Sequence, residues 1–224
     1  MNVFVCGQKS FGRAVLKGLL DAGHTVTGVC PAPQEKHKDK MVGYALLKGI
    51  PVFGDLDALT ADSIPGGTDL IVSAHSWWMI SQKAIERCSY GGIGFHPSLL
   101  PRHRGQDAVR WAVHMGDAIT GMTIYSLSGD VCDGGDILMQ KPVFIAPGWS
   151  YHQLWNAMFP EAARMVVDAV GIIERGEAEW TRQDDRFATY EPSWNRPRLK
   201  RNDLIRLAAP DTTGAETEGS YGQN

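Results

Sequence analysis

One histidine and one aspartate of this 224-residue chain stand in sequence contexts that suit acid/base chemistry. His96 follows a short apolar run and precedes a turn that prolines and a glycine punctuate, so we expect it at the end of a strand. Asp133 comes later, inside the glycine-rich loop 129–136. Open parallel sheets bind ligands beside the carboxyl ends of their strands. A carboxylate that orients an imidazole and stabilises its charged form makes the usual acid/base pair, so we predict that a hairpin returns Asp133 to His96.

The elements around this pair alternate in the order that builds a parallel sheet. Residues 2–6 read as a strand, 7–12 as a glycine-bounded turn, 13–22 as an amphipathic helix and 24–30 as a second strand, which together form a βαβ unit. Further strands are expected at 51–53, 69–74, 92–96, 122–127 and 137–144, and further helices at 41–48, 81–88, 106–115 and 151–175, the last of them bent at Pro160. The sequence therefore predicts an α/β protein with a Rossmann-like, mostly parallel sheet, helices on both of its faces and a short C-terminal extension.

The chain is expected to form one catalytic domain with an appendage. We place the domain at 1–180 and an extension packed on it at 181–207. Within 180–197 we expect a small strand or packing segment, and at 203–207 a last helical turn. Residues 208–224 are small, polar and glycine-containing, which is typical of a disordered tail. We find neither an internal repeat nor a linker between domains.

Composition and charge exclude several classes of protein. Hydrophobic residues make up 43% and charged residues 21%, which is ordinary for a globular chain, and the net charge of −3 gives no general attraction to nucleic acid or anionic lipid. No apolar run reaches the roughly 20 residues of a membrane span, and residues 1–5 read as a strand rather than a signal peptide. The cysteines show no metal-ligand spacing. We therefore expect small-molecule partners, no nucleic acid, no membrane, no metal and a cytoplasmic location, with a homodimer as an open alternative.

The central segment resembles the folate-dependent formyltransferase family. The resemblance is carried by His96-Pro-Ser-Leu-Leu-Pro-Arg-His-Arg-Gly105, then Thr123-Ile124, then Asp133-Gly-Gly135, in the family's order and at similar spacing. It runs from Met1 to about Tyr190. Within the family it resembles in particular the hydrolase domain of 10-formyltetrahydrofolate dehydrogenases, which shares the turn at 7–12, and it also resembles methionyl-tRNA and nucleotide-sugar formyltransferases.

The resemblance implies a role for several residues. It makes His96 and Asp133 catalytic and 10-formyltetrahydrofolate the co-substrate. It implies a pterin slot lined by two loops, which hold Trp77, Trp78, Met79 and Ile80 in one and Val131 and Cys132 in the other. Substrate contacts are expected at Ser98, Arg104, Gln106 and Thr123. For these side chains ordinary structural roles stay open: core packing for the tryptophans, backbone capping for the hydroxyls, loop support for Arg104 and the first helical turn for Gln106.

One position departs from the family pattern. The family's asparagine, which helps to bind the formyl oxygen as charge develops on it, falls on Gly94. Loss of one such donor lowers a rate by about 10²–10³-fold. We predict an enzyme that transfers the formyl group to a small amine, such as an amino sugar or a nucleotide-linked amine. The alternatives are a hydrolase that releases formate and tetrahydrofolate, and a folate-binding protein with little catalysis. A dinucleotide-dependent reductase is disfavoured, because the turn at 7–12 lacks the three-glycine pattern.

Overall fold

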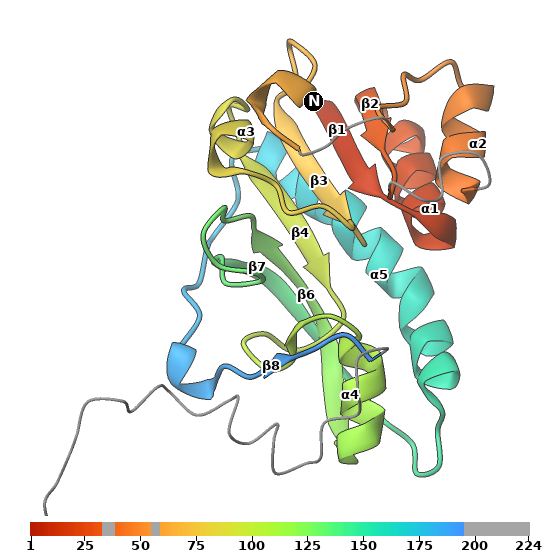
Figure 1. Cartoon of the computed structure of the whole chain (residues 1–224), viewed down its shortest axis with the longest axis vertical. Coiled ribbons are helices and arrows are strands. Elements are labelled where there is room, and N and C mark those ends of the chain that lie inside the picture. Colours follow the sequence, from red (N-terminus) through yellow and green to blue (C-terminus); the bar gives the residue numbers. More distant parts are fainter. Residues whose placement is uncertain (33–38, 55–58, 195–224) are drawn as a thin grey trace, which may run out of the picture.

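A six-stranded mixed sheet is the centre of the computed structural model, which describes residues 1–32, 39–54 and 59–194 (Figure 1). The strands stand in the order β2-β1-β3-β4-β6-β7. Their bounds are Asn2–Gly7 for β1, Thr25–Cys30 for β2, Leu70–Ala74 for β3, Gly92–His96 for β4, Ile119–Ser126 for β6 and Ile137–Phe144 for β7. The first four strands pair in parallel, whereas β6 is antiparallel to both β4 and β7. The predicted mostly parallel sheet is confirmed, and the predicted hairpin is the β6–β7 pair.

Helices cover both faces of the sheet, as predicted. Their bounds are Lys9–Asp21 for α1, Lys40–Leu47 for α2, Gln82–Glu86 for α3, Ala108–Met115 for α4 and Tyr151–Glu174 for α5, with short 3₁₀ helices at Ala61–Ser63 and Asp185–Phe187. The larger core cluster joins α1 and α5 to one face, and a smaller cluster joins α3 to the other. Helix α5 runs through Pro160 as one element, and a capping box at Ser150 begins it.

Two expectations differ from the structure, whereas the small strand expected within 180–197 is present. The strand expected at 51–53 is reduced to one bridge, between Val29 and Val52. Helix α1 begins at Lys9 rather than at 13, where the Asp39 carboxylate accepts a hydrogen bond from the Lys9 amide at 2.5 Å and so satisfies one of the free amides of the first turn. The extension adds a second small sheet, in which β5 (Arg104–Gly105) pairs with β8 (Tyr190–Glu191). The expectations for 203–207 and 208–224 lie outside the described residues, so the domain bounds stay predictions.

Strand β4 presents its two faces to different surroundings. Ile93 and Phe95 lie in the larger core cluster. Because side chains alternate along a strand, Gly94 and His96 point to the opposite face. In Figure 1 the carboxyl end of β4 points toward the part of the molecule that holds α4 and β8. The fold therefore brings His96 to the end of the sheet where the extension packs.

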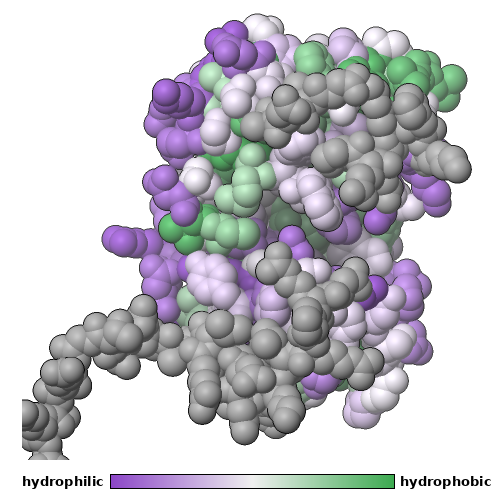
Figure 2. Space-filling view, viewed as in Figure 1, coloured by the Kyte–Doolittle hydropathy of each residue, from purple (hydrophilic) through white to green (hydrophobic). Residues whose placement is uncertain are grey.

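The surface shows a local apolar region rather than a membrane segment. Figure 2 shows hydrophobic side chains at the corner where α2 lies, and Leu46 and Leu47 of that helix are exposed. Among the helices of the described ranges, none has both the length and the apolar character needed to cross a bilayer.

Candidate active site

His96 is held at the end of β4 by a hydrogen bond to the loop that follows. Its ring is buried, and Nε2 lies 2.6 Å from the His103 carbonyl oxygen. A carbonyl only accepts hydrogen bonds, so Nε2 carries the proton and donates it. The other nitrogen, Nδ1, lies 3.4 Å from Asp133 Oδ2, longer than a typical hydrogen bond. The structure thus brings together the two residues that the sequence paired, with Nδ1 as the ring atom that faces the carboxylate.

Asp133 is fixed by donors on both carboxylate oxygens. The Tyr125 hydroxyl donates to Oδ1 at 2.5 Å, and the Gly105 amide donates to Oδ2 at 2.8 Å. The Cys132 thiol lies 3.5 Å from Oδ2. The residue has a positive φ of 53°, which side-chain-bearing residues seldom adopt outside tight turns and functional loops. The backbone is therefore held in an uncommon conformation that aims the carboxylate at His96.

The surroundings of Asp133 favour its charged form. Burial alone would raise the pKa of this carboxyl group, because a charge is poorly solvated in the interior. The His96 ring and the donors from Tyr125, Gly105 and Cys132 outweigh burial, so the pKa of Asp133 is lowered from its ordinary value. Asp133 is consequently an ionised carboxylate at neutral pH, able to balance a positive charge or to accept a proton.

The loop 133–135 approaches β6 so closely that glycine is required. A Cβ placed on Gly135 would lie 1.7 Å from the Ser126 carbonyl oxygen, which no side chain can tolerate. A Cβ on Gly105 would lie 2.7 Å from the Glu191 carbonyl oxygen, and Gly105 has a φ of 95°. The glycines that the sequence shows beside Asp133 and His96 therefore allow backbone contact between loop, hairpin and extension.

His103 connects the histidine loop to a buried ion cluster. Its ring is 2% exposed and lies between two carboxylates, with Nε2 2.6 Å from Asp117 Oδ2 and Nδ1 3.0 Å from Glu191 Oε1. Burial alone would lower the pKa of His103, but Glu191 and Asp117 outweigh it and raise the pKa above its ordinary value. Since the His103 carbonyl accepts the hydrogen bond from His96 Nε2, this cluster supports the loop that holds the His96 ring.

We expect this cluster to make stability depend on pH. A histidine whose pKa is raised by folding stabilises the folded protein. This contribution to the free energy of unfolding is fully present below the unfolded pKa of about 6.5, and it is lost as the pH rises through the higher pKa of the folded state. The His103→Gln variant should therefore be less stable than wild type by about 1–3 kcal/mol at pH 6, with a smaller difference at pH 9. Urea unfolding at both values measures this. Exposed His152→Gln is the control, and a pH-independent difference for His103→Gln would contradict the assignment.

Arg104 is a buried side chain that binds the extension. Its guanidinium donates to Gln183 Oε1 from Nε at 3.1 Å and from Nη2 at 2.7 Å. Nη2 also reaches Asp185 Oδ1 at 2.8 Å, and Nη1 reaches the Tyr190 hydroxyl at 2.9 Å. The expected substrate contact of Arg104 is not what this geometry favours, because the guanidinium is turned into the protein. Loop support, the alternative left open by the sequence, describes its position better.

Gln183 links the Arg104 guanidinium to the loop that holds Asp133. Its amide nitrogen donates to the Asp133 carbonyl at 2.8 Å and to the Gly135 carbonyl at 2.6 Å. The side chain is buried, and its oxygen receives the Arg104 donors. One glutamine of the extension thus clamps the loop of the aspartate onto the arginine of β5.

Ser98 and Thr123 also use their hydroxyls within the protein. Both are fully buried; the Ser98 hydroxyl donates to the Arg102 carbonyl at 2.5 Å, and the Thr123 hydroxyl donates to the Ser98 carbonyl at 2.7 Å. They hold the turn after His96, which is the backbone role that the sequence left open, and their expected substrate contacts are disfavoured. Gln106 is exposed beside this loop, so its expected contact stays a prediction.

The loops expected to line the pterin slot are neighbours. The Gly129 amide donates to Gln82 Oε1 at 3.1 Å, which joins the start of the loop 129–136 to the first residue of α3, just after the loop that holds residues 77–80. Of the six side chains expected there, Trp77, Met79, Val131 and Cys132 are exposed, and their ligand contacts stay predictions. The other two side chains contact the protein itself. Trp78 donates its indole N–H to the Pro31 carbonyl at 2.8 Å, and Ile80 is buried in the smaller core cluster.

Three residues of the site were not predicted from the sequence. Tyr125 reads as an ordinary strand residue, and Gln183 stands in a segment of weak pattern. His103 lies inside the motif itself, and a second histidine near His96 was a signal that could have been followed. No group of three or more His, Cys, Asp or Glu side chains in the described part of the chain is arranged to hold a metal ion.

A histidine that faces an ionised aspartate at the carboxyl end of a central strand has the arrangement expected of an acid/base pair on an α/β fold. A model of the formyl transferase family matches residues 56–170, half of the chain, and the chain belongs to this family. It is therefore an enzyme of formyl-group chemistry.

Known proteins agree with this membership. The cytosolic 10-formyltetrahydrofolate dehydrogenase of Xenopus tropicalis is 35% identical over 213 residues, 90% of this chain and 24% of that protein. The methionyl-tRNA formyltransferase of Agathobacter rectalis is 30% identical over 230 residues, 94% of this chain and 74% of that protein. Among solved structures, an N-formyltransferase from Helicobacter canadensis in complex with folinic acid and dTDP-3-aminofucose has a TM-score of 0.70 at 16% identity, over 84% of this chain and 70% of that one. That likeness concerns the fold, and the chain spans about a quarter of the length of the dehydrogenases.

Proposed function

We propose that this enzyme takes the formyl group of 10-formyltetrahydrofolate and passes it to a small amine, with His96 and Asp133 as the catalytic residues. The family is one of folate-dependent formyl transfer, and 10-formyltetrahydrofolate is the co-substrate. The observation that carries the proposal is the ionised Asp133 carboxylate facing His96 Nδ1 at the end of β4.

The geometry suggests how the reaction would proceed. The amine lone pair attacks the formyl carbon, and the carbonyl electrons move onto the oxygen. His96 Nδ1, when protonated, stabilises that oxygen, because Nε2 is occupied by the His103 carbonyl. Asp133 accepts the proton that the attacking nitrogen loses. The carbonyl then re-forms as the bond from the formyl carbon to the folate nitrogen breaks, and that nitrogen takes up the proton held by Asp133. Tetrahydrofolate and the N-formylated product leave, and Asp133 is again a carboxylate.

The folate would bind across the two neighbouring loops. Trp77, Met79 and Val131 offer exposed apolar surface there, and Cys132 stands directly beside the catalytic aspartate. Slots for flat ligands are lined mostly by apolar side chains with a few polar groups. Because Trp77 is exposed there, we expect the tryptophan fluorescence of the protein to report folate binding, with Trp77→Phe as the variant that removes this part of the signal.

The start of α1 limits the class of acceptor. Helix N-termini commonly bind phosphate through their free amides. Here the buried Asp39 carboxylate accepts from the amide of Lys9 and, at 2.7 and 3.2 Å, from those of Met41 and Val42. The Asp39 carboxylate thus takes the Lys9 amide at the start of α1, which is no longer available to a phosphate of the acceptor. We therefore propose an amine that presents no phosphate to this helix.

Hydrolysis is the second candidate, with water in place of the amine. Gly94 provides no side chain beside the formyl group, which favours a slower reaction with an abundant nucleophile. Seven of the relatives with 33–35% identity are 10-formyltetrahydrofolate dehydrogenases. A folate-binding protein with little catalysis is the third outcome that the experiment must separate.

The first experiment measures tetrahydrofolate release from 10-formyltetrahydrofolate, with and without a panel of amino sugars and other small amines. Release that needs an amine supports transfer, and release without one supports hydrolysis. Saturable quenching of Trp77 with no release under either condition would leave a binding protein. We expect His96→Ala to lower the active reaction by about 10²–10⁴-fold. The exposed His114→Ala is the control, and full turnover by His96→Ala would reject the catalytic assignment.

Small molecules are the proposed partners, and the cytoplasm is the proposed location. Relatives include proteins named cytosolic and others named mitochondrial. All four cysteines are free thiols, which agrees with a reducing compartment.

A further inference from the structure

Strand β4 has a glycine, Gly94, two residues before His96, and the ring of a tyrosine from the neighbouring strand β6 fills the space that a side chain there would take. Gly94 of β4 stands opposite Tyr125 of β6 in the antiparallel register. A Cβ placed on Gly94 would lie 2.6 Å from Tyr125 Cζ and 2.7 Å from its hydroxyl oxygen. Real side chains do not approach that closely. The tyrosine ring therefore occupies the space in which a side chain at position 94 would begin.

The position of this ring brings its hydroxyl into the active site. Residues 94 and 96 point to the same face of β4, so the phenol beside Gly94 lies on the same side of the sheet as the His96 ring. The hydroxyl donates to Asp133 Oδ1 at 2.5 Å. Tyr125 is 6% exposed, so neither the ring nor the hydrogen bond is a surface contact.

We infer that Tyr125 is a positioning residue of this active site: its ring takes the space beside Gly94, and its hydroxyl holds the Asp133 carboxylate opposite His96. The inference rests on the proposed function, in which Asp133 accepts the proton of the nucleophile. A phenol has one proton to donate, and the 2.5 Å bond commits it to Asp133 rather than to the formyl oxygen. Tyr125 therefore acts through the aspartate.

The electrostatics of the pair agree with this role. Burial and the neighbouring Asp133 charge raise the pKa of Tyr125 well above its ordinary value, so the phenol stays protonated and remains a donor. The groups around the Asp133 carboxylate come from four segments: the His96 ring on β4, the Gly105 amide on β5, the Tyr125 hydroxyl on β6 and the Cys132 thiol on its own loop. Removal of the tyrosine hydroxyl takes away one donor that lowers the pKa of Asp133, so that pKa should rise.

The test compares wild type with Tyr125→Phe by two independent readouts. The first is the titration of the Asp133 carboxyl carbon by NMR, in which the variant should titrate about 1 pH unit or more above wild type. The second is the acid limb of kcat/KM for the folate, which should move to higher pH by a similar amount, because the reaction needs the ionised carboxylate. We expect kcat at neutral pH to fall about tenfold, with KM changed less than about twofold.

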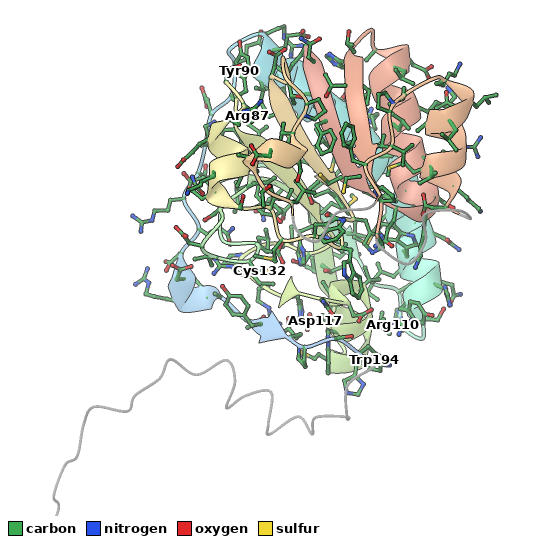
Figure 3. All side chains as sticks on the ribbon, turned by 45° about the horizontal axis from the view of Figure 1, so that its top comes forward. Arg87, Tyr90, Arg110, Asp117, Cys132 and Trp194 are labelled. Carbon is green, nitrogen blue, oxygen red and sulfur yellow. The ribbon has the colours of Figure 1, made fainter. Side chains whose placement is uncertain are left out.

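Two further variants sharpen the comparison. Gly94→Ala should drive the ring out of its place and reproduce the pH shift of Tyr125→Phe. Tyr90→Phe removes a hydroxyl from an exposed tyrosine, which Figure 3 shows far from Cys132 and the catalytic loop, and it should leave both readouts unchanged. Far-UV circular dichroism checks that each variant is folded.

The outcomes separate this inference from the proposed function. Suppose that wild type turns over, but that Tyr125→Phe shows neither a shifted Asp133 titration nor a shifted acid limb of kcat/KM. That result would overturn the role of Tyr125 and leave the proposed function standing. Absence of turnover by wild type would reject the proposed function, whereas the NMR titration of Asp133 would still decide whether Tyr125 controls the carboxylate.

Discussion

The Asp133→Asn variant is expected to lose about 10³-fold in kcat while it still binds folate. The amide has nearly the shape of the carboxylate, but it carries no charge to face His96 Nδ1 and cannot take up a proton from the nucleophile. It must also turn its NH₂ group toward either the Tyr125 hydroxyl or the Gly105 amide, both of which donate to the carboxylate. Steady-state release of tetrahydrofolate gives kcat, and quenching of tryptophan fluorescence gives the folate Kd.

A matched control lies in the same loop. Asp136 is exposed, and Asp136→Asn changes a carboxylate to an amide without touching the histidine, so its kcat should stay within about twofold of wild type. Retention of more than about a tenth of wild-type turnover by Asp133→Asn would show that another group accepts the proton. Loss of folate binding together with turnover would assign Asp133 to the slot instead of to the chemistry.

The sheet and its main helices were predictable because each depends on local pattern. The βαβ unit at residues 2–30 and the long helix α5 follow from hydrophobic periodicity and glycine punctuation, which act within one element. The contact between His96 and Asp133 was predictable because short connections limit where a hairpin loop can lie, and the carboxyl ends of the strands in an open sheet share one edge. The bridge at Val52 fell short of a strand, since its short run pairs with β2 at a single point.

The support of the catalytic pair was not predictable, because it depends on register and on distant contacts. A glycine within a strand, such as Gly94, indicates that another group packs closely against the backbone. Which group this is depends on the register between β4 and β6, and that register cannot be read from a single sequence. Gln183 reaches the Asp133 carbonyl across 50 positions of the chain. The internal hydrogen bonds of Ser98, Thr123 and Arg104 were not predictable for the same reason, because polar side chains near a motif can bind groups that are remote in sequence, and their expected substrate contacts stay predictions.

Replacement of the buried arginine should lower stability and catalysis together. In Arg104→Met the Gln183 oxygen loses both of its donors and the exposed Asp185 loses its partner, so we expect the free energy of unfolding to fall by about 3 kcal/mol. The loosened Gln183 no longer holds the Asp133 loop, so kcat should fall as well. Urea denaturation and steady-state kinetics on one preparation measure both effects.

The pattern of the two effects decides what Arg104 does. An arginine that contacts substrate would raise KM on removal and leave stability nearly unchanged, whereas one that supports the loop lowers stability and kcat with little change in KM. Arg102→Met is the control, because this neighbouring arginine is half exposed, lies 3.6 Å from Asp117 and should contribute less than about 0.5 kcal/mol. The stability and kcat of Arg104→Lys should lie between those of wild type and Arg104→Met, since one ammonium cannot reach Gln183, Asp185 and Tyr190 at once. A stable Arg104→Met protein with a raised KM would restore the substrate contact that the sequence first predicted, and it would show that Gln183 holds the Asp133 loop without help from Arg104.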